Sequence, residues 1–266
     1  MLKERNINQA KNSFDLLNTT SHEEMWDLID AKADTEEQWL DEQASYLRSQ
    51  MVGRDDRLGR IGVGVQYVVY GLPNNRVFKV AQTDNSALNE HRRQGGSDNL
   101  VEEILRLRED SVGYVQKLIS SYPEASPLFG NPIFNGEKGI AGAYEQDKLT
   151  FFGGDGFNSL QKDEQIKYAR NYIDLIKLMW TYGFSDRTMN FQVNAGLNNE
   201  GEIVLADFGE IDLSKDDLIR VVENHDWEKS WGVNILRKYV KPIVIDMFES
   251  NLTKDALDEL WAVNLK

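Results

Sequence analysis

Three oxygen-bearing side chains stand close together in the second half of the sequence. Asp186 and Asn190 lie four residues apart, directly after a helix-like stretch, and Asp207 follows Asn190 by 17 residues. Carboxylate and amide oxygens are ligands that Mg²⁺ accepts, and a further carboxylate can orient or deprotonate an attacking hydroxyl. The pattern therefore predicts phosphoryl transfer, with Asn190 and Asp207 on the metal and Asp186 acting on the hydroxyl.

A second group of candidate residues lies in the first half of the chain. Gly62 and Gly64 stand between strand-like residues, where glycine lets backbone amides approach a phosphate closely. Lys79 lies within the run 76–80 and shares a strand face with Val77, because side chains alternate along a strand. An ammonium group beside an apolar wall suits a purine nucleotide. Each signal is weak alone, since glycine pairs also mark bulges and an edge-strand lysine can reach water.

The elements that must hold these residues follow from hydrophobic periodicity and turn residues. Strands are expected over 59–81, with a turn at 72–75, and two more over 129–152. Helices are expected over 1–51, over 85–121 with a break at Gly95-Gly96, and over 163–182 with Gly183 closing the helix. A hairpin is expected over 191–207, with Phe191 in its first strand, and Pro242 is expected to kink or interrupt a later helix. This order predicts an α+β fold.

Composition excludes several classes of protein. The 266 residues are 41% hydrophobic and 10% aromatic, which indicates a globular chain with one two-lobed domain or two modest ones. A net charge of −14 disfavours binding to nucleic acid or to an anionic membrane. The absence of cysteine excludes disulfides, zinc ribbons, iron–sulfur clusters and a thiol nucleophile.

The sequence gives only weak indications of cellular location and of metal binding by histidine. No run approaches about 18 apolar residues and the amino terminus does not resemble a signal peptide, so a cytoplasmic protein is expected. His22, His91 and His225 share no spacing typical of a metal site, and each is expected to be an ordinary surface or core residue.

In their order along the chain, the motifs of residues 59 to about 210 resemble the protein-kinase signature set. The segment from Gly62 to Val80, with Leu72-Pro73-Asn74-Asn75-Arg76-Val77 before the strand lysine, is similar to the early protein kinases of lytic podovirus bacteriophages. The resemblance implies a two-lobed protein-kinase-like fold. Its parts would be a helical extension at 1–52, a small antiparallel-sheet lobe at 53–148 and a mostly helical lobe at 149–266. It also implies ATP and Mg²⁺ as cofactors, and Ser or Thr of host proteins as acceptors.

The resemblance also implies a role for each matching catalytic residue. Lys79 would hold the α- and β-phosphates, Asp186 would be the base, and Asn190 and Asp207 would bind magnesium.

Other positions would complete the nucleotide site. Gly62, Gly64 and Val69 would lie along the phosphate loop and the strand after it. Glu90 would orient Lys79, with Glu102 and Glu103 as alternatives, and Glu145 would end the strand that leads to an adenine-binding hinge.

The chain departs from the family pattern at several positions. Tyr67 replaces the third glycine, Phe184-Ser185 replaces His-Arg, Thr188 replaces a lysine, and the Asp186 to Asn190 spacing is one residue short. No Ala-Pro-Glu motif follows Asp207, and the stretch before a helix near Ser214 is too short for a regulated activation loop.

Two alternatives therefore stay open beside the protein kinase. One is a pseudokinase that binds and inhibits a host protein without chemistry. The other is a small-molecule kinase of the aminoglycoside or choline type, whose cationic acceptor suits the acidic chain. The oligomeric state is left open.

Overall fold

The computed structural model describes residues 60–63, 66–71, 75–81, 87–88, 91–92, 101–134, 144–152 and 155–262. The helices expected within residues 1–51 lie outside these ranges, as do Gly64 and Glu90. The chain divides into two compact units. The N-terminal unit comprises Met1–Glu109 and Pro132–Gln146, and the C-terminal unit comprises Asp110–Asn131 and Asp147–Lys266. Helices and small antiparallel sheets make up the described residues, so the fold is α+β as predicted.

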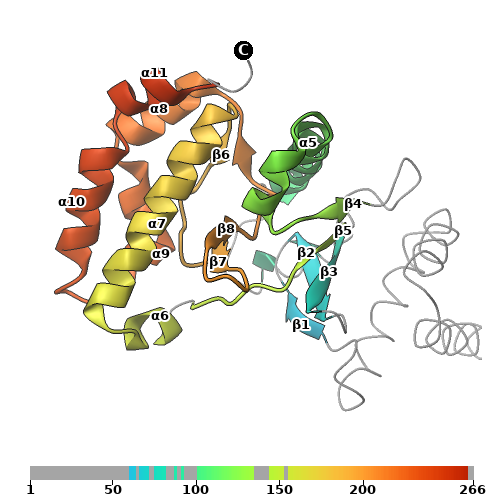
Figure 1. The fold of residues 1–266 in the computed structure, drawn as a ribbon, viewed down its shortest axis with the longest axis horizontal. Helices are drawn as coiled ribbons and strands as arrows, with labels where there is room; N and C mark the ends of the chain where they lie inside the picture. Colours follow the sequence, from blue (N-terminus) through green and yellow to red (C-terminus); the bar gives the residue numbers. More distant parts are fainter. Residues whose placement is uncertain are drawn as a thin grey trace, which may run out of the picture. The chain divides into compact units, whose positions relative to one another are not determined.

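The N-terminal unit contains a five-stranded sheet (Figure 1). Its strands, in spatial order, are β1 (Arg60–Val63), β2 (Tyr67–Gly71), β3 (Arg76–Ala81), β5 (Tyr144–Asp147) and β4 (Ile133–Phe134). The pairs β1–β2, β2–β3 and β4–β5 are antiparallel, and Val69 is the register partner of Lys79. Asn75, in the predicted turn before β3, has a φ of 58°, a left-handed conformation that asparagine tolerates. The strands predicted between 59 and 81 are therefore confirmed.

The C-terminal unit is mostly helical. Its helices are the second half of α5 (Val101–Ser121), then α6 (Asp155–Ser159), α7 (Lys162–Thr181), α8 (Lys215–Glu223), α9 (Trp231–Asn234), α10 (Lys241–Asn251) and α11 (Lys254–Leu260). Two short 3₁₀ segments are η2 (Pro123–Phe129) and η3 (Asp226–Lys229). Two antiparallel strand pairs complete the unit: β6 (Ser185–Asp186) with β9 (Ile211–Asp212), and β7 (Ala195–Leu197) with β8 (Ile203–Leu205).

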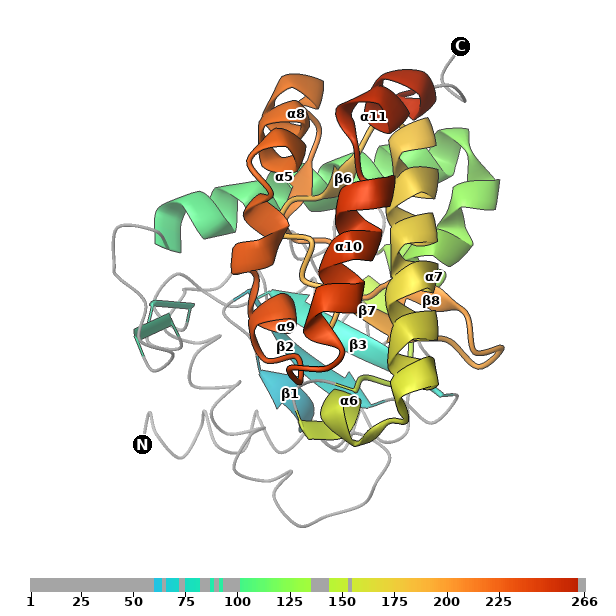
Figure 2. The same cartoon turned by 90° about the vertical axis from the view of Figure 1, so that its left-hand side faces the viewer.

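Helix α7 organises the C-terminal unit. A reciprocal capping box between Gln161 and Glu164 starts it, and Gly183, with a φ of 77°, follows its last turn. Its buried face includes Tyr168, Tyr172, Ile176 and Trp180, spaced four residues apart, and α10 and α11 pack against it (Figure 2). The helix predicted over 163–182 is thus confirmed, and its end fixes where the chain enters β6.

Two local expectations are wrong. Phe191 lies in a turn and not in a strand: its ring packs against Phe157 and Phe248, with centroids 5.4 and 6.0 Å away, and the strand begins only at Ala195. Pro242 lies in the first turn of α10 and does not kink the helix, because a first-turn proline lacks only an amide that has no partner within the helix anyway.

Residues 110–131 belong to the C-terminal unit, whereas the sequence analysis grouped them with residues 53–148. Hydrogen bonds explain the assignment: the Tyr114 hydroxyl donates to the Tyr182 carbonyl at 2.8 Å, and the Ile211 amide donates to Ser111 Oγ at 3.0 Å. Across the described parts of the chain, no helix has the length and apolar content needed to cross a membrane.

Candidate functional site

Asp186 is the most enclosed of the predicted site residues. It lies in β6, directly after α7, and only 1% of its surface is exposed. Its Oδ2 accepts a hydrogen bond from the Tyr172 hydroxyl at 2.7 Å. Its Oδ1 accepts three, from the Thr188 amide (3.1 Å), the Thr188 hydroxyl (3.2 Å) and Asn194 Nδ2 (3.0 Å). Among the described residues, the groups that donate hydrogen bonds to this carboxylate are therefore all neutral.

The electrostatics of Asp186 follow from this enclosure. Burial raises the pKa of Asp186, and the hydrogen bonds from Tyr172, Asn194 and Thr188 lower it in part. Burial, together with the nearby charge of Asp186, raises the pKa of Tyr172 well above its usual 10. Tyr172 thus stays protonated and donates its hydrogen bond.

Asn194 connects Asp186 to Asp207 and is not among the site residues predicted from the sequence. Its side-chain Nδ2 donates to Asp186 and also to the Thr188 hydroxyl, at 2.9 Å. Its carbonyl accepts the Ala206 amide at 2.6 Å and the Asp207 amide at 3.1 Å. The Asn194 Oδ1 is the other polar atom of this side chain, and an amide oxygen can bind a cation. No motif marks Asn194, since its place depends on the turn that Phe191 makes.

Asp207 follows β8 directly and is half-buried. Its Oδ1 accepts the Gly209 amide at 3.2 Å, and the ring of Phe208 packs edge-on against Phe129, with centroids 5.4 Å apart. The Asp-Phe-Gly segment is therefore fixed by its own turn and by a buried aromatic contact. The backbone of Asp207 is thus bonded to that of Asn194, and its carboxylate accepts the Gly209 amide.

Asn190, predicted as a metal ligand, has a different partner. Its Oδ1 accepts the Gly232 amide at 3.1 Å, and Gln192 Nε2 donates to the Gly232 carbonyl at 2.6 Å. A Cβ at position 232 would lie 2.7 Å from Asn190 Oδ1, so only glycine permits this close approach. In the structure Asn190 thus holds α9, and the amide that contacts Asp186 is that of Asn194.

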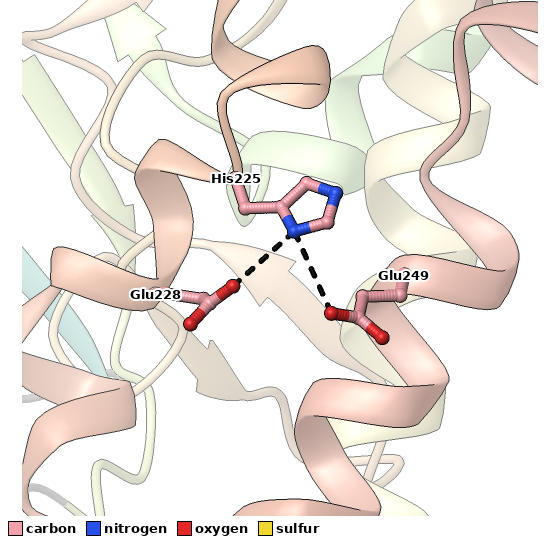
Figure 3. A group of neighbouring side chains, drawn as sticks. All are labelled: His225, Glu228 and Glu249. Carbon is pink, nitrogen blue, oxygen red and sulfur yellow. Dashed lines mark hydrogen bonds and ion pairs between the residues drawn. The ribbon is translucent and has the colours of Figure 1, made fainter.

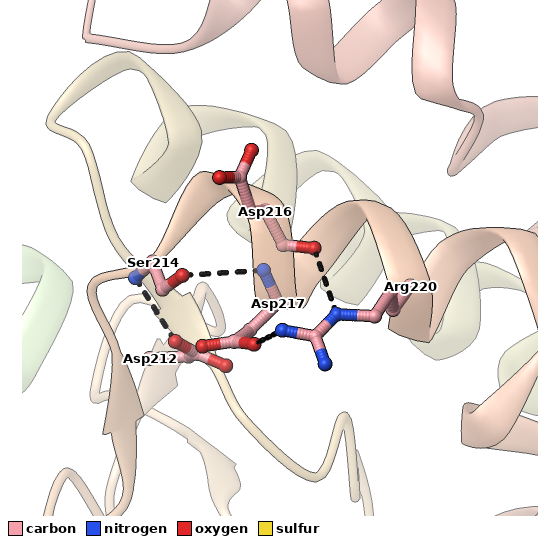
Figure 4. A network of polar contacts seen from close by, with 5 residues as sticks. All are labelled: Asp212, Ser214, Asp216, Asp217 and Arg220. Carbon is pink, nitrogen blue, oxygen red and sulfur yellow. Dashed lines mark hydrogen bonds and ion pairs between the residues drawn. The ribbon is translucent and has the colours of Figure 1, made fainter.

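The segment after Asp207 is short and tightly bonded (Figure 4). Asp212 Oδ1 accepts the Ser214 amide at 3.0 Å, and Ser214 Oγ caps α8 by accepting the Asp217 amide at 3.2 Å. Arg220 pairs with the Asp217 carboxylate. Burial raises the pKa of Asp212, whose register partner is Ser185. The predicted short connection to a helix near Ser214 is confirmed.

Lys79 lies in β3 of the N-terminal unit and is 8% exposed. Its Nζ is 5.9 Å from the centre of the Tyr67 ring and 5.6 Å from that of Tyr144, distances at which a cation is attracted to an aromatic face. The two rings therefore help to hold the ammonium group within the sheet. Val69 lies directly across from it on β2.

The other predicted nucleotide-site residues are less informative. Glu145 is 1% exposed, and its Oε2 accepts Arg76 Nε at 3.3 Å, so its carboxylate is part of an ion pair within the sheet. Gly62 lies in β1, next to an irregularity in the pairing with β2. Gly64 and Glu90 lie outside the described residues, and of the two alternatives to Glu90, Glu103 is exposed on α5.

No protein-family profile matches the sequence, and a search of curated proteins finds no significant match. The chemistry must be argued from the residues themselves. In the C-terminal unit, a buried carboxylate (Asp186), an oriented amide (Asn194) and a half-buried carboxylate (Asp207) form one bonded series. Such oxygens suit a hard divalent cation and an acceptor hydroxyl.

Proposed function

We propose that the protein is an ATP- and Mg²⁺-dependent phosphotransferase with a protein-kinase-like fold. The observation that carries this proposal is the bonded series from Asp186 through Asn194 to Asp207. It orders a carboxylate for a hydroxyl and a carboxylate for a metal within one short stretch of backbone, which is the arrangement that phosphoryl transfer uses. The acceptors we propose are Ser or Thr of host proteins of a bacteriophage, as the sequence resemblance implies.

The residues have separate roles in this proposal. Lys79 neutralises the α- and β-phosphates, and Asp207 binds Mg²⁺. Asp186 orients the acceptor hydroxyl and accepts its proton as the hydroxyl oxygen attacks the γ-phosphorus and the bond to the leaving β–γ bridging oxygen breaks. For the second metal ligand there are two candidates, Asn190 from the sequence and Asn194 from the geometry. We favour Asn194 because its carbonyl is bonded to the Asp207 amide.

The decisive experiment follows the label from γ-labelled ATP with Mg²⁺, in bacterial host extract and with the protein alone. Asp186→Asn and Asp207→Asn test the two proposed roles. Asp216→Asn is the matched control, because Asp216 is an exposed aspartate on α8 outside the bonded series. Labelled proteins that disappear in both site variants and persist in the control support a protein kinase.

Nucleotide binding tests the division of roles. Lys79→Met should weaken ATP binding whether or not Mg²⁺ is present, since the ammonium contacts phosphate directly. Asp207→Asn should weaken only the binding that Mg²⁺ adds. If Lys79→Met and Asp207→Asn weakened ATP binding to the same extent both with and without Mg²⁺, the roles proposed for Lys79 and Asp207 would be wrong.

A second candidate function rests on the enclosure of Asp186. With 1% exposure, its carboxylate meets an acceptor hydroxyl only if groups that enclose it, such as Thr188, move aside. A protein that binds ATP and a host protein without transferring phosphate needs no such movement. ATP binding without any labelled product identifies this pseudokinase, while a labelled small molecule identifies the small-molecule kinase that the net charge of −14 also suits.

A further inference from the structure

Three side chains outside the bonded series converge on one point of the C-terminal unit (Figure 3). His225 precedes η3, Glu228 lies within η3, and Glu249 lies near the end of α10. The His225 Nδ1 is 3.2 Å from Glu228 Oε1 and 3.5 Å from Glu249 Oε1. All three ligand atoms lie within 4.8 Å of one another. Figure 3 shows both carboxylates turned toward the same ring nitrogen.

This geometry suits a metal ion better than a set of hydrogen bonds. A ring nitrogen carries at most one proton, so Nδ1 cannot give a full hydrogen bond to two carboxylates at once. A tetrahedral ion with bonds of about 2.0–2.2 Å places its donor atoms roughly 3.3–3.6 Å apart. The separations of 3.2 and 3.5 Å are close to that spacing. Two carboxylates and a neutral imidazole also balance the charge of a divalent cation.

The surrounding packing holds the ligands in place. The His225 ring stacks on Trp227, with centroids 5.4 Å apart and an angle of 25° between the planes. Trp227 is buried and packs against Phe248, with centroids 5.0 Å apart, and Phe248 precedes Glu249 in the chain. Buried aromatic contacts therefore join η3 to α10 beneath the cluster. The ligand side chains themselves are 41–43% exposed, which leaves room for water as a fourth ligand.

We propose that His225, Glu228 and Glu249 bind a divalent transition-metal ion of the zinc class. The imidazole selects such an ion over Mg²⁺ and Ca²⁺, which prefer oxygen ligands only. The bound ion ties η3 to α10 and so stabilises this part of the C-terminal unit. The sequence shows only the His225-x-x-Glu228 spacing, because Glu249 comes from a helix 24 residues after His225.

The test measures Zn²⁺ binding to the metal-stripped full chain by competition with a chromogenic chelator. Every chain in this test carries the background substitution Asp207→Asn, because it removes the proposed magnesium ligand. Two variants remove ligands: Glu249→Gln, and His225→Asn, which suits the φ of 52° at this position because asparagine tolerates the left-handed region. Asp246→Asn is the matched control, since Asp246 is an exposed acid on the same helix.

We expect one Zn²⁺ per chain, with affinity unchanged in the Asp246→Asn control. Each ligand variant should lower the affinity at least about tenfold, the loss that even outer-shell changes produce. A large excess of Mg²⁺ or Ca²⁺ should not displace the ion. Failure to bind one Zn²⁺, or binding that both ligand variants leave unchanged, overturns the proposal.

Thermal unfolding provides an independent readout. Zn²⁺ should raise the Tm of the background chain and of the control, and should raise the Tm of both ligand variants by less. The Tm without metal shows whether each variant is folded. If Zn²⁺ changes the Tm of none of the chains, the cluster binds no such ion and the proposal is wrong.

Discussion

Asp186 and Asp258 are both strongly bonded carboxylates of the C-terminal unit, but they are held in opposite ways. Asp186 is buried and accepts hydrogen bonds from the neutral residues Tyr172, Thr188 and Asn194. Asp258 is exposed and lies between two lysines, with Lys215 Nζ 2.7 Å from Oδ1 and Lys254 Nζ 2.8 Å from Oδ2. Burial raises the pKa of Asp186, whereas the hydrogen bonds and charges of the lysines lower the pKa of Asp258 to about 2.

The difference separates a group that costs stability from one that contributes to it. A buried carboxylate whose hydrogen-bond donors in the described structure are all neutral is unfavourable to ionise, so an apolar or amide residue at this position would cost less stability. Costly ionisable groups of this kind cluster at functional sites. The exposed ion pair between Asp258 and Lys215 needs no such explanation, because it links α11 to the start of α8 at the surface. Of the two carboxylates, Asp186 is therefore the better candidate for a role in the proposed function.

The largest expected effect is the loss of phosphoryl transfer in Asp186→Asn. Removing a general base typically lowers the rate by about 10²–10⁴-fold. The amide fits the site, because its oxygen can accept the bonds from Thr188 and Asn194 while its NH₂ donates to the Tyr172 hydroxyl. We therefore expect the variant to be folded and at least as stable as the native chain at neutral pH, as thermal unfolding would show.

The stability difference between Asp186→Asn and the native chain should depend on pH. The pKa of Asp186 is raised in the folded state, so its contribution is fully present below the unfolded value of 3.8 and is lost as pH rises through the folded value. The advantage of Asp186→Asn over the native chain should therefore be greatest at neutral pH and vanish in acid. An advantage that instead grows as pH falls would contradict the buried, uncompensated carboxylate.

The next effect concerns the two asparagines. Asn194→Ala removes a donor from Asp186, and in our proposal it also removes a metal oxygen, so the Mg²⁺ concentration for half-maximal activity should rise. Asn190→Ala removes the acceptor of the Gly232 amide and should mainly lower stability, by about 1–3 kcal/mol. Titrating activity with Mg²⁺ distinguishes them. The opposite pattern would return the metal role to Asn190.

These asparagines also show what the sequence could and could not predict. Local patterns predicted α7 from apolar residues at helical spacing, the strands around Lys79, and a hairpin before Asp207. Asn194 was missed because its position depends on Phe191, whose burial among rings distant in sequence turns the chain before β7. Hydrophobic periodicity reflects only residues close together in the sequence, so it cannot predict packing between residues that are far apart in it.

The pairing of β6 with β9 was missed for a related reason. Each strand has two residues, too few to show an alternating pattern, and about 25 residues separate them in the sequence. The His225 cluster likewise joins residues from η3 and α10. Motif spacing found the residues of the candidate site that lie in one segment, and missed those that only the tertiary fold brings together.

A smaller effect tests whether Asp186 is charged in the folded protein. Tyr172→Phe keeps the buried ring and removes the donor to Oδ2, which should cost about 1.5–3 kcal/mol, the range for a hydrogen bond to a charged group. Tyr168→Phe is the matched control, because the Tyr168 hydroxyl donates to the carbonyls of Phe191 and Ala195. It should cost about 0.5–1.5 kcal/mol.

Chemical denaturation of both tyrosine variants measures these costs. In acid, where Asp186 is protonated, the cost of Tyr172→Phe should approach that of Tyr168→Phe. Equal costs at neutral pH would show that Asp186 is already neutral there, and the difference between Asp186 and Asp258 would then be one of charge state as well as burial.

The smallest effect comes from the exposed side of the comparison. Asp258→Asn should lower the Tm slightly at low ionic strength, and added salt should remove most of that difference because it screens exposed charges. The lowered folded pKa means that the contribution of Asp258 is present above the unfolded value of 3.8 and is lost as pH falls through about 2. Glu259→Gln, an exposed charge change next to it on α11, is the control and should show neither the salt nor the acid dependence to the same extent. A salt-independent loss in Asp258→Asn would mean that the two lysines bind Asp258 as a rigid, partly desolvated cluster. The contrast with Asp186 would then rest only on the presence of neighbouring cations.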